Sequence, residues 1–349
     1  MLEYLLNMMG EPLFGALIGA FTGLVFGISA QRSAFCLRAA TVEFGRGSLG
    51  PKVAVWLLTF STAVIWVQAA QLAGLFDAQQ SRIMATTGSW SGAILGGLMT
   101  GAGMVLARGC SGRLLVLAAT GNLRSVISGL VFALVAQMSL HGWLSGLRTW
   151  IAGLWITPNG QNLNLLSLLG LPQQAGIVFG GAVAALAIVL ALRHKIGTSA
   201  LVFASGVGFA VALGWGLTYA LSLAAFDPVV VTSATFSGPS ANTLMFFLTA
   251  EEALSFDIGL VPGVFLGAFV AAALKREVTL QGFEGESQMR RLLTGAALMG
   301  FGAMLAGGCA IGAGVTGGSI FAATAWAALA AMWAGAIVTD RLLDAPRAA

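Results

Sequence analysis

The chain has 349 residues, of which 58% are hydrophobic and only 9% are charged, and its formal net charge is +4. Soluble proteins carry about 25% charged residues, so this composition excludes an ordinary soluble domain and predicts a surface that faces lipid. The basic residues lie between apolar runs, where membrane topology accounts for them, so we expect no nucleic-acid partner.

Nine apolar runs approach the length of about 20 residues that a membrane-spanning helix needs. In chain order they cover residues 13–30, 53–74, 90–107, 125–146, 174–192, 199–224, 258–274, 292–306 and 320–339. The first run lacks the basic segment of a secretory signal, so we expect it to be retained as a span. The sequence therefore predicts an all-α integral membrane protein with about nine transmembrane helices.

Glycines recur every four residues in the first run, at Gly15, Gly19, Gly23 and Gly27. A stripe of residues without side chains lets another membrane helix approach closely. Gly263 and Gly267 form a similar pair in the seventh run. We expect these glycines to serve helix packing.

The first of the three cysteines follows the first run directly. Cys36 stands in the segment Q-R-S-A-F-C-L-R, between Arg32 and Arg38. A loop cysteine beside basic membrane anchors explains this segment as well as an anion site does. The residues alone leave both interpretations open.

The other two cysteines end two copies of one motif. The segments 101–110 and 300–309 both read G-x-G-x-x-L-A-x-G-C, at an offset of 199 positions. Glycine clusters end helices, and irregular backbone at membrane depth is tolerated only where it is buried in protein or lines a polar cavity. We therefore expect Cys110 and Cys309 to lie at helix breaks beside a pathway.

The helical run that starts near Ser111 suits an anion. Its free backbone N–H groups and the positive end of its dipole would point at the break, and a thiol can donate a weak hydrogen bond or act as a thiolate. A buried cysteine can also be a plain small apolar residue. The repetition of the cysteine inside a matched glycine motif favours the functional interpretation for Cys110 and Cys309.

The basic residues predict how the chain is oriented. All but two of the 17 Lys and Arg residues fall in alternate loops, the exceptions being Arg82 and Arg148. Because basic loops stay in the cytoplasm, we expect the N-terminus outside and the C-terminus in the cytoplasm. An odd number of spans separates the two motif copies, so they face opposite sides. This predicts two inverted pseudo-repeats, residues 1–172 and 173–349, an architecture associated with transport.

The sequence offers little sign of enzymatic or metal chemistry. The patterns of a phosphate-binding loop, a serine hydrolase elbow and a zinc protease helix do not occur in it. The cysteines form no C-x-x-C pair, and His141 and His194 lie far apart. We expect a protein that is not an enzyme and that binds neither a metal nor a cofactor.

These motifs resemble the YeeE/YedE family, the sulfur transporters that include bacterial thiosulfate importers. The resemblance rests on R-S-x-x-C at 32–36, R-G-C at 108–110 with Arg113 and G-N at 121–122, F-S-G-P at 236–239 with T-L-M-F at 243–246, and G-G-C-x-I-G at 307–312. Two segments depart from the family pattern, Leu37-Arg38 and Ser111-Gly112. Other branches of the family are linked to selenium or other sulfur species.

The resemblance implies a compact fold in the bacterial inner membrane, with short re-entrant helices of both halves meeting at the membrane centre. It implies that Cys36, Cys110 and Cys309 pass thiosulfate inward by contacts from S–H to sulfur, while Gly109 and Gly308 allow close approach. It also implies a small cytoplasmic sulfur-carrier partner resembling TusA.

The leading hypothesis is thus import of thiosulfate or a related small sulfur-containing anion across the lipid bilayer. The residues expected to bind it are Cys36, Cys110, Cys309, Gly109, Gly308, Ser111 and Arg113. The alternatives are a membrane sulfurtransferase that relays sulfur as a persulfide of Cys110 or Cys309, a transporter of a selenium compound, and a scaffold with structural cysteines.

Overall fold

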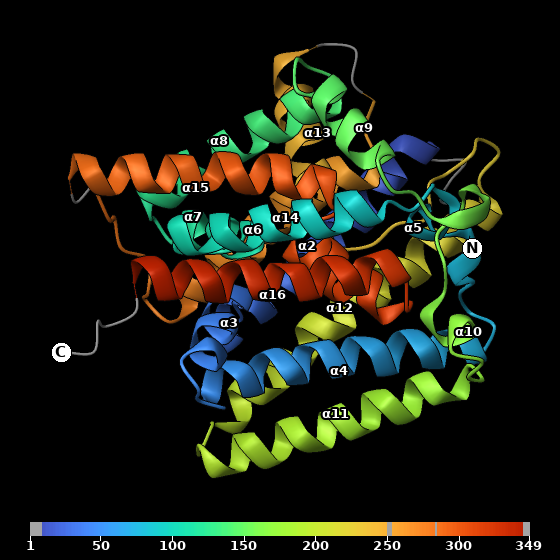
Figure 1. Cartoon of the computed structure of the whole chain (residues 1–349), viewed down its shortest axis with the longest axis horizontal. Helices are drawn as coiled ribbons and strands as arrows, with labels where there is room; N and C mark the ends of the chain where they lie inside the picture. The colour runs from blue at the N-terminus through green and yellow to red at the C-terminus, as the bar shows by residue number, and fades with distance from the viewer. Residues whose placement is uncertain (1–8, 250–252, 283–284, 345–349) are drawn as a thin grey trace.

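The computed structural model describes residues 9–249, 253–282 and 285–344. Within these ranges the chain folds into helices, and nine of them are long and apolar enough to cross a membrane (Figure 1). The nine predicted spans are thereby confirmed. The long helices are α2 (Glu11–Ser33), α4 (Pro51–Leu72), α6 (Trp90–Leu106), α8 (Leu123–Leu140), α11 (Gln174–Arg193), α12 (Thr198–Ala224), α14 (Phe256–Leu274), α15 (Glu286–Leu305) and α16 (Ala323–Leu343).

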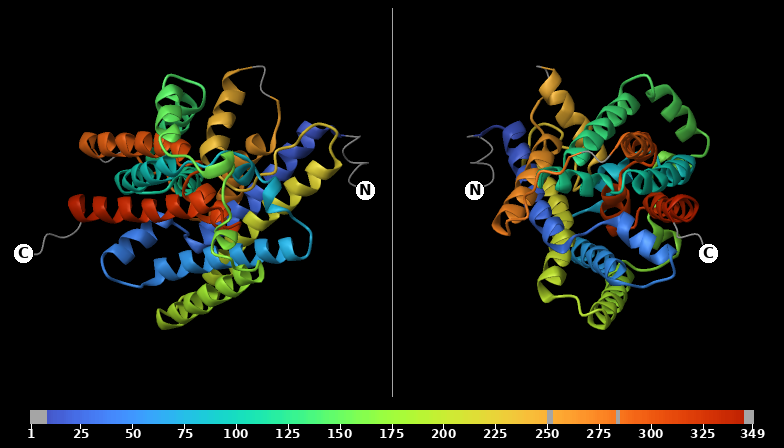
Figure 2. Two further views of the ribbon diagram at one scale, coloured as in Figure 1. Left: turned by 45° about the vertical axis from the view of Figure 1, so that its right-hand side comes forward. Right: turned by 90° about the vertical axis from the view of Figure 1, so that its left-hand side faces the viewer.

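Shorter helices lie between the long ones. Three of the spans continue past a break into a short helix, so that they cover Glu11–Gly45, Trp90–Ala119 and Glu286–Gly317. The remaining elements are α3 (Leu37–Gly45), η1 (Ala78–Gln80), α5 (Arg82–Ala85), α7 (Ser111–Ala119), α9 (Ser145–Gly153), η2 (Pro158–Gly160), α10 (Leu165–Leu168), α13 (Ser237–Leu248) and the π-helix η3 (Ala310–Gly317). Figure 2 shows α13 standing across the direction of α15 and α16.

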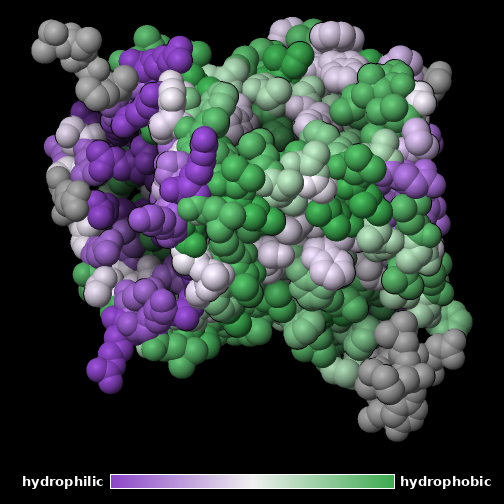
Figure 3. Space-filling model, turned by 90° about the horizontal axis from the view of Figure 1, so that it is seen from below, coloured by the Kyte–Doolittle hydropathy of each residue, from purple (hydrophilic) through white to green (hydrophobic). Residues whose placement is uncertain are grey.

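The two ends of the molecule differ in polarity. We call the end that holds the C-terminus of α16 the inner end, and the end that holds the start of α2 the outer end (Figure 1). Hydrophilic side chains gather densely at the inner end, and apolar side chains cover the middle of the surface (Figure 3). Many apolar side chains of the long helices are exposed, among them Val178, Leu186 and Val202, as expected for a surface in contact with lipid.

The glycine stripe explains how closely the spans pack. A Cβ atom added to Gly19, Gly23 or Gly27 of α2 would lie 2.1–2.3 Å from a backbone carbonyl oxygen of α14. Gly259, Gly263 and Gly267 of α14 meet the backbone of α2 in the same way. Each helix thus lies directly on the backbone of the other, which only residues without side chains permit. The predicted packing role is confirmed for Gly19, Gly23 and Gly27 of the stripe, whereas a Cβ at Gly15 would make only ordinary contacts.

Candidate functional site

All three cysteines occupy the same backbone position, directly after a break in a long helix. A residue with left-handed backbone lies just beyond the end of each of the helices α2, α6 and α15. The N–H of the residue after it bonds back to a carbonyl five residues earlier, as in a Schellman motif. The left-handed residues are Ala34 (φ 52°), Arg108 (φ 56°) and Gly307 (φ 77°), and Cys36, Cys110 and Cys309 then form the N-caps of α3, α7 and η3. Cys36 therefore shares the geometry of the other two, although the repeat does not mark it.

Cys36 and Cys110 form a pair. Their side chains are close enough to interact with each other. Cys110 is 1% exposed, whereas Cys36 is partly exposed. The guanidinium of Arg113, in the first turn of α7, is close enough to Cys36 to interact with it electrostatically. A cation therefore stands beside this pair of thiols.

Cys309 has a different environment, made of backbone donors. Its Sγ atom accepts hydrogen bonds from the N–H of Phe236 at 3.3 Å and from the N–H of Gly312 at 3.5 Å. The hydroxyl of Thr235 lies 3.9 Å away. Because Phe236 precedes α13 and Gly312 lies in the first turn of η3, two helix N-termini converge on one sulfur atom. Such an arrangement favours negative charge.

A dry constriction lies beside Cys110. Cys110 and Gly112 line a space that is narrower than a water molecule, and the other residues around it are Phe26, Ala30, Phe35, Arg113, Val116 and Ile311. Cys110 and Cys309 are nevertheless near enough to interact electrostatically. The structure is therefore closed to water beside Cys110.

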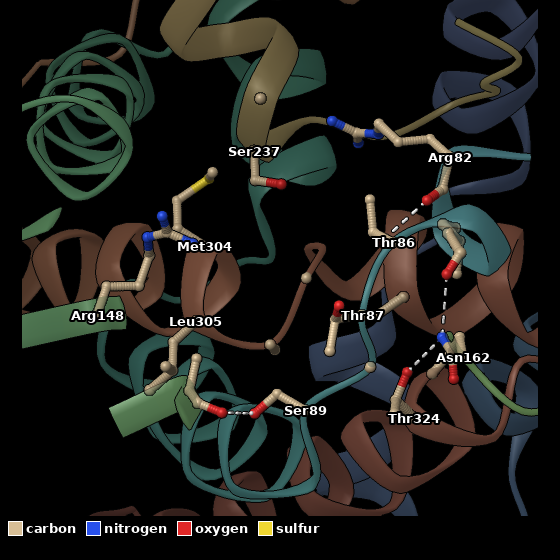
Figure 4. Close-up of a pocket in the computed structure, with 18 of the residues that line it drawn as sticks. Arg82, Thr86, Thr87, Ser89, Arg148, Asn162, Ser237, Met304, Leu305 and Thr324 are labelled. Atoms are coloured by element: carbon tan, nitrogen blue, oxygen red, sulfur yellow. Dashed lines mark hydrogen bonds between the residues drawn. The ribbon is translucent and has the colours of Figure 1, made fainter. Parts of the chain in front are cut away.

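An open pocket lies on the outer side of Cys309. Its volume is about 490 Å³, and it reaches residues 304–307, which lead directly to Cys309. The two basic residues set apart by the loop count, Arg82 and Arg148, both line it and enter from opposite sides (Figure 4). Arg148 is held by a hydrogen bond from its Nε to the carbonyl of Ser139. The pocket thus presents two cations to the outer end of the molecule.

Ion pairs hold the inner end together. Arg46, just after α3, binds Asp340 of α16 with two hydrogen bonds of 2.9 Å. Arg291 of α15 binds Asp344 with hydrogen bonds of 2.8 and 2.6 Å. The hydrogen bonds from Arg291 lower the pKa of the Asp344 carboxyl below its usual value, and Arg38 and Arg108 add to this effect. The end of α16 thereby ties α3 to α15, next to the two breaks that carry Cys36 and Cys110.

The remaining predicted site residues lie next to these cysteines in the chain, and the space around them differs. A Cβ at Gly308 would lie 2.7 Å from the backbone nitrogen of Ala313, whereas a Cβ at Gly109 would meet only side chains, those of Leu114 at 3.4 Å and Arg113 at 3.8 Å. Ser111 begins α7, and its buried hydroxyl is without a hydrogen-bond partner in the described part of the chain. It also borders an apolar cavity between α7, α8, α13 and α14.

Sequence reasoning missed four contributors to the site. Phe236 contacts Cys309 from the F-S-G-P segment, which was used only for the family resemblance, and Thr235 contacts it from the position directly before that segment. The count of basic residues sets Arg82 and Arg148 apart from the others, but it does not predict that both line one pocket. The sequence did carry signals for these residues. Arg82 and Arg148 are the only two basic residues outside the alternate loops, and Phe236 begins the F-S-G-P segment.

Comparison with known proteins assigns the chain to a protein family. The family model described as Sulphur transport matches residues 32–338. A relative from Escherichia coli (strain K12), named thiosulfate transporter TsuA, is 26% identical over an alignment 349 positions long. The alignment covers 91% of this chain and 92% of the relative. A protein of the same name from Spirochaeta thermophila is 28% identical, covering 89% of this chain and 93% of that protein.

Proposed function

The chain belongs to the sulphur transport family, and from that premise we propose that it imports thiosulfate, or a closely related small sulfur-containing anion, across the bacterial inner membrane. Both relatives named above are thiosulfate transporters. The observation that carries the proposal is the shared position of Cys36, Cys110 and Cys309, each at a helix break and each capping a helix N-terminus.

The route runs through the elements described above. The anion enters the outer pocket between Arg82 and Arg148 and reaches Cys309 at the N-termini of α13 and η3. It then passes the dry constriction to the thiols of Cys110 and Cys36 and leaves toward the basic inner end. Ser111 and Arg113, at the start of α7, complete the inner station. A dianion is costly to move through hydrocarbon, so several weak stations in sequence favour passage.

Thiols suit this substrate because of its chemistry. The terminal sulfur of thiosulfate is a soft, polarizable acceptor for a weak S–H donor, whereas sulfate has only oxygen atoms. At Cys309, the sulfur atom already accepts two backbone N–H groups, which polarises its own S–H bond toward a substrate atom. Selectivity for sulfur-containing anions follows from this donor.

Helix packing supports the proposed inverted repeat of residues 1–172 and 173–349. α2 of the first half packs on α14 of the second, and α12 of the second packs on α4 of the first. Likewise α6 packs on α16 while α15 packs on α8. If α2 corresponds to α12, α4 to α14, α6 to α15 and α8 to α16, exchanging the two halves maps each of these contacts onto another of them. α11 has no counterpart in this exchange. We place the N-terminus outside and the C-terminus in the cytoplasm, and we assign α3, α7, α13 and η3 to the expected re-entrant helices.

Two finer points stand with this proposal. The basic inner end offers a surface for the small cytoplasmic sulfur-carrier protein, resembling TusA, that the family resemblance implies. The adjacent thiols of Cys36 and Cys110 are the observation that favours the alternative function, a sulfurtransferase that holds sulfur as a cysteine persulfide. A transporter has no need of a covalent intermediate, so a stable mass adduct separates the two functions.

The proposal is tested by uptake of labelled thiosulfate, sulfate and selenite into proteoliposomes. We expect thiosulfate uptake by the wild type and a loss of at least about tenfold in Cys36→Ala, Cys110→Ala and Cys309→Ala, because each removes one station. Ser222→Ala, a polar side chain of α12 bonded within its own helix, is the control. Uptake no greater than in empty liposomes contradicts the proposal, and preferred selenite uptake identifies a selenium transporter. Added sulfur on a cysteine by mass spectrometry identifies a sulfurtransferase.

A further inference from the structure

A fourth helix N-terminus joins the three that carry cysteines. α13 begins beside the break at Cys309, and its N-cap is Phe236. The other three N-caps at the site are Cys36, Cys110 and Cys309. An aromatic ring therefore occupies the position that a thiol occupies on the other three helices.

Phe236 lies between the outer and inner cysteines. Its backbone N–H donates to the sulfur of Cys309. Its ring is completely buried, packs edge-on against Phe26 with 5.0 Å between ring centroids, and lies 3.2 Å from the Cβ position of Gly112. Gly112 and Phe26 both line the dry constriction beside Cys110. One residue thus contacts the sulfur on one side and covers the passage on the other.

The start of α13 has space on its outer side. Ser237 and Gly238, the two residues after Phe236, line the outer pocket of about 490 Å³. A Cβ at Gly238 would meet no closer atom than Asp257 Oδ2 at 3.8 Å. The segment before Phe236 is fixed, because Thr316 donates a hydrogen bond to the carbonyl of Ala234. The first turn of α13 can therefore tilt toward the pocket about a fixed point.

We infer that Phe236 is the gate of the transport pathway. Its ring closes the passage between Cys309 and Cys110, and it opens when the first turn of α13 tilts toward the outer pocket. The inference rests on the proposed transport function, because it assigns a role within the proposed pathway. A dry constriction lined mostly by apolar side chains blocks hydrated ions, since they would have to shed water to enter it.

The hydrogen bond to Cys309 links the gate to its substrate. An anion at Cys309 competes with the sulfur atom for the N–H of Phe236, because both accept at the same helix N-terminus. When the anion takes this hydrogen bond, the start of α13 is released from the sulfur. Since the ring and the N–H belong to one residue, release of the N–H and displacement of the ring occur together.

The gate is tested by the accessibility of Cys110 from the outer side. Oriented proteoliposomes are treated on the side of the outer pocket with an anionic methanethiosulfonate reagent, and labelled peptides are quantified by mass spectrometry. We expect Phe236→Ala to raise the labelling rate of Cys110 at least about tenfold, because the dry barrier is removed, and Phe236→Leu to raise it much less. Phe76→Ala, a buried ring stacked on Trp215 outside the constriction, should leave the rate unchanged.

A second measurement reports on selectivity. We expect Phe236→Ala to admit sulfate, so that the ratio of thiosulfate to sulfate uptake falls at least about tenfold. A Cys110 labelling rate within about twofold of the wild type, in a variant with unchanged melting temperature, overturns the inference. If Phe236→Ala does not fold, Phe26→Ala removes the neighbouring ring and must give the same increase. The labelling result decides the gate even if the wild type takes up no thiosulfate.

Discussion

The break at Cys110 borders the dry constriction, whereas the break at Cys309 adjoins the outer pocket. Both follow the same ten-residue pattern, yet they are built differently. The sulfur of Cys110 meets another thiol, that of Cys36, and the helix that follows is an ordinary α-helix. The sulfur of Cys309 meets two backbone N–H groups, and the helix that follows is a π-helix.

This difference suggests a division of work between two copies of one motif. Backbone donors cannot move independently of the chain, so the hydrogen bonds at Cys309 couple its sulfur to the start of α13. The sulfur of Cys110 has a side-chain partner, which can rotate away at small cost without moving the backbone. Under the proposed function, the break at Cys309 would couple anion binding to a movement of α13, and the break at Cys110 would release the anion.

The largest difference between the two breaks should appear on adding a methyl group. Gly308→Ala places a Cβ 2.7 Å from the backbone of η3, so we expect destabilisation of about 1–3 kcal/mol and near-complete loss of thiosulfate uptake. Gly109→Ala meets only side chains, at 3.4 Å and 3.8 Å, and should cost less than about 0.5 kcal/mol. Thermal unfolding in detergent and proteoliposome uptake measure both variants. Equal effects would show that the two breaks are equally constrained.

The second test concerns Arg82 and Arg148, which line the pocket beside the outer break. We expect Arg82→Gln and Arg148→Gln each to raise the KM for thiosulfate about three- to tenfold with a smaller change in kcat, because each cation raises the local concentration of the anion. The effect should weaken at high ionic strength as the charges are screened. Arg193→Gln, which removes one exposed charge at the inner end, is the matched control. An equal rise in KM for Arg193→Gln would refute a specific role for the outer pocket.

The smallest effect is expected at the inner end, where Asp344 pairs with Arg291. The pKa of Asp344 is lower in the folded protein than in the unfolded chain, so the pair stabilises the fold above the unfolded pKa of about 3.9 and loses this contribution as the pH falls through the folded value. The pair is partly exposed, so the contribution is about 1 kcal/mol or less. Melting temperatures between about pH 3 and 7 should fall less steeply for Asp344→Asn than for the wild type. Parallel curves would exclude this contribution.

Much of the fold could be predicted from local features of the sequence. Apolar runs gave all nine spans, because a segment in lipid must satisfy its backbone internally and so forms a helix. Gly307 and Gly308 predicted a break before Cys309, since a left-handed residue there ends α15. The break before Cys36 was harder to predict, because Ala34 adopts the left-handed conformation without being a glycine.

The amino-acid sequence by itself determined the membrane class, the spans, the packing role of the glycine stripe and the helix breaks at Cys110 and Cys309, because hydropathy and glycine act locally along the chain. Only the tertiary structure decided which groups meet at those breaks. Phe236 reaches Cys309 from 73 positions away, Cys36 meets Cys110, and Arg82 faces Arg148 across one pocket. Such contacts depend on how the spans pack against one another, and side-chain packing between distant segments leaves no periodic signal in the sequence.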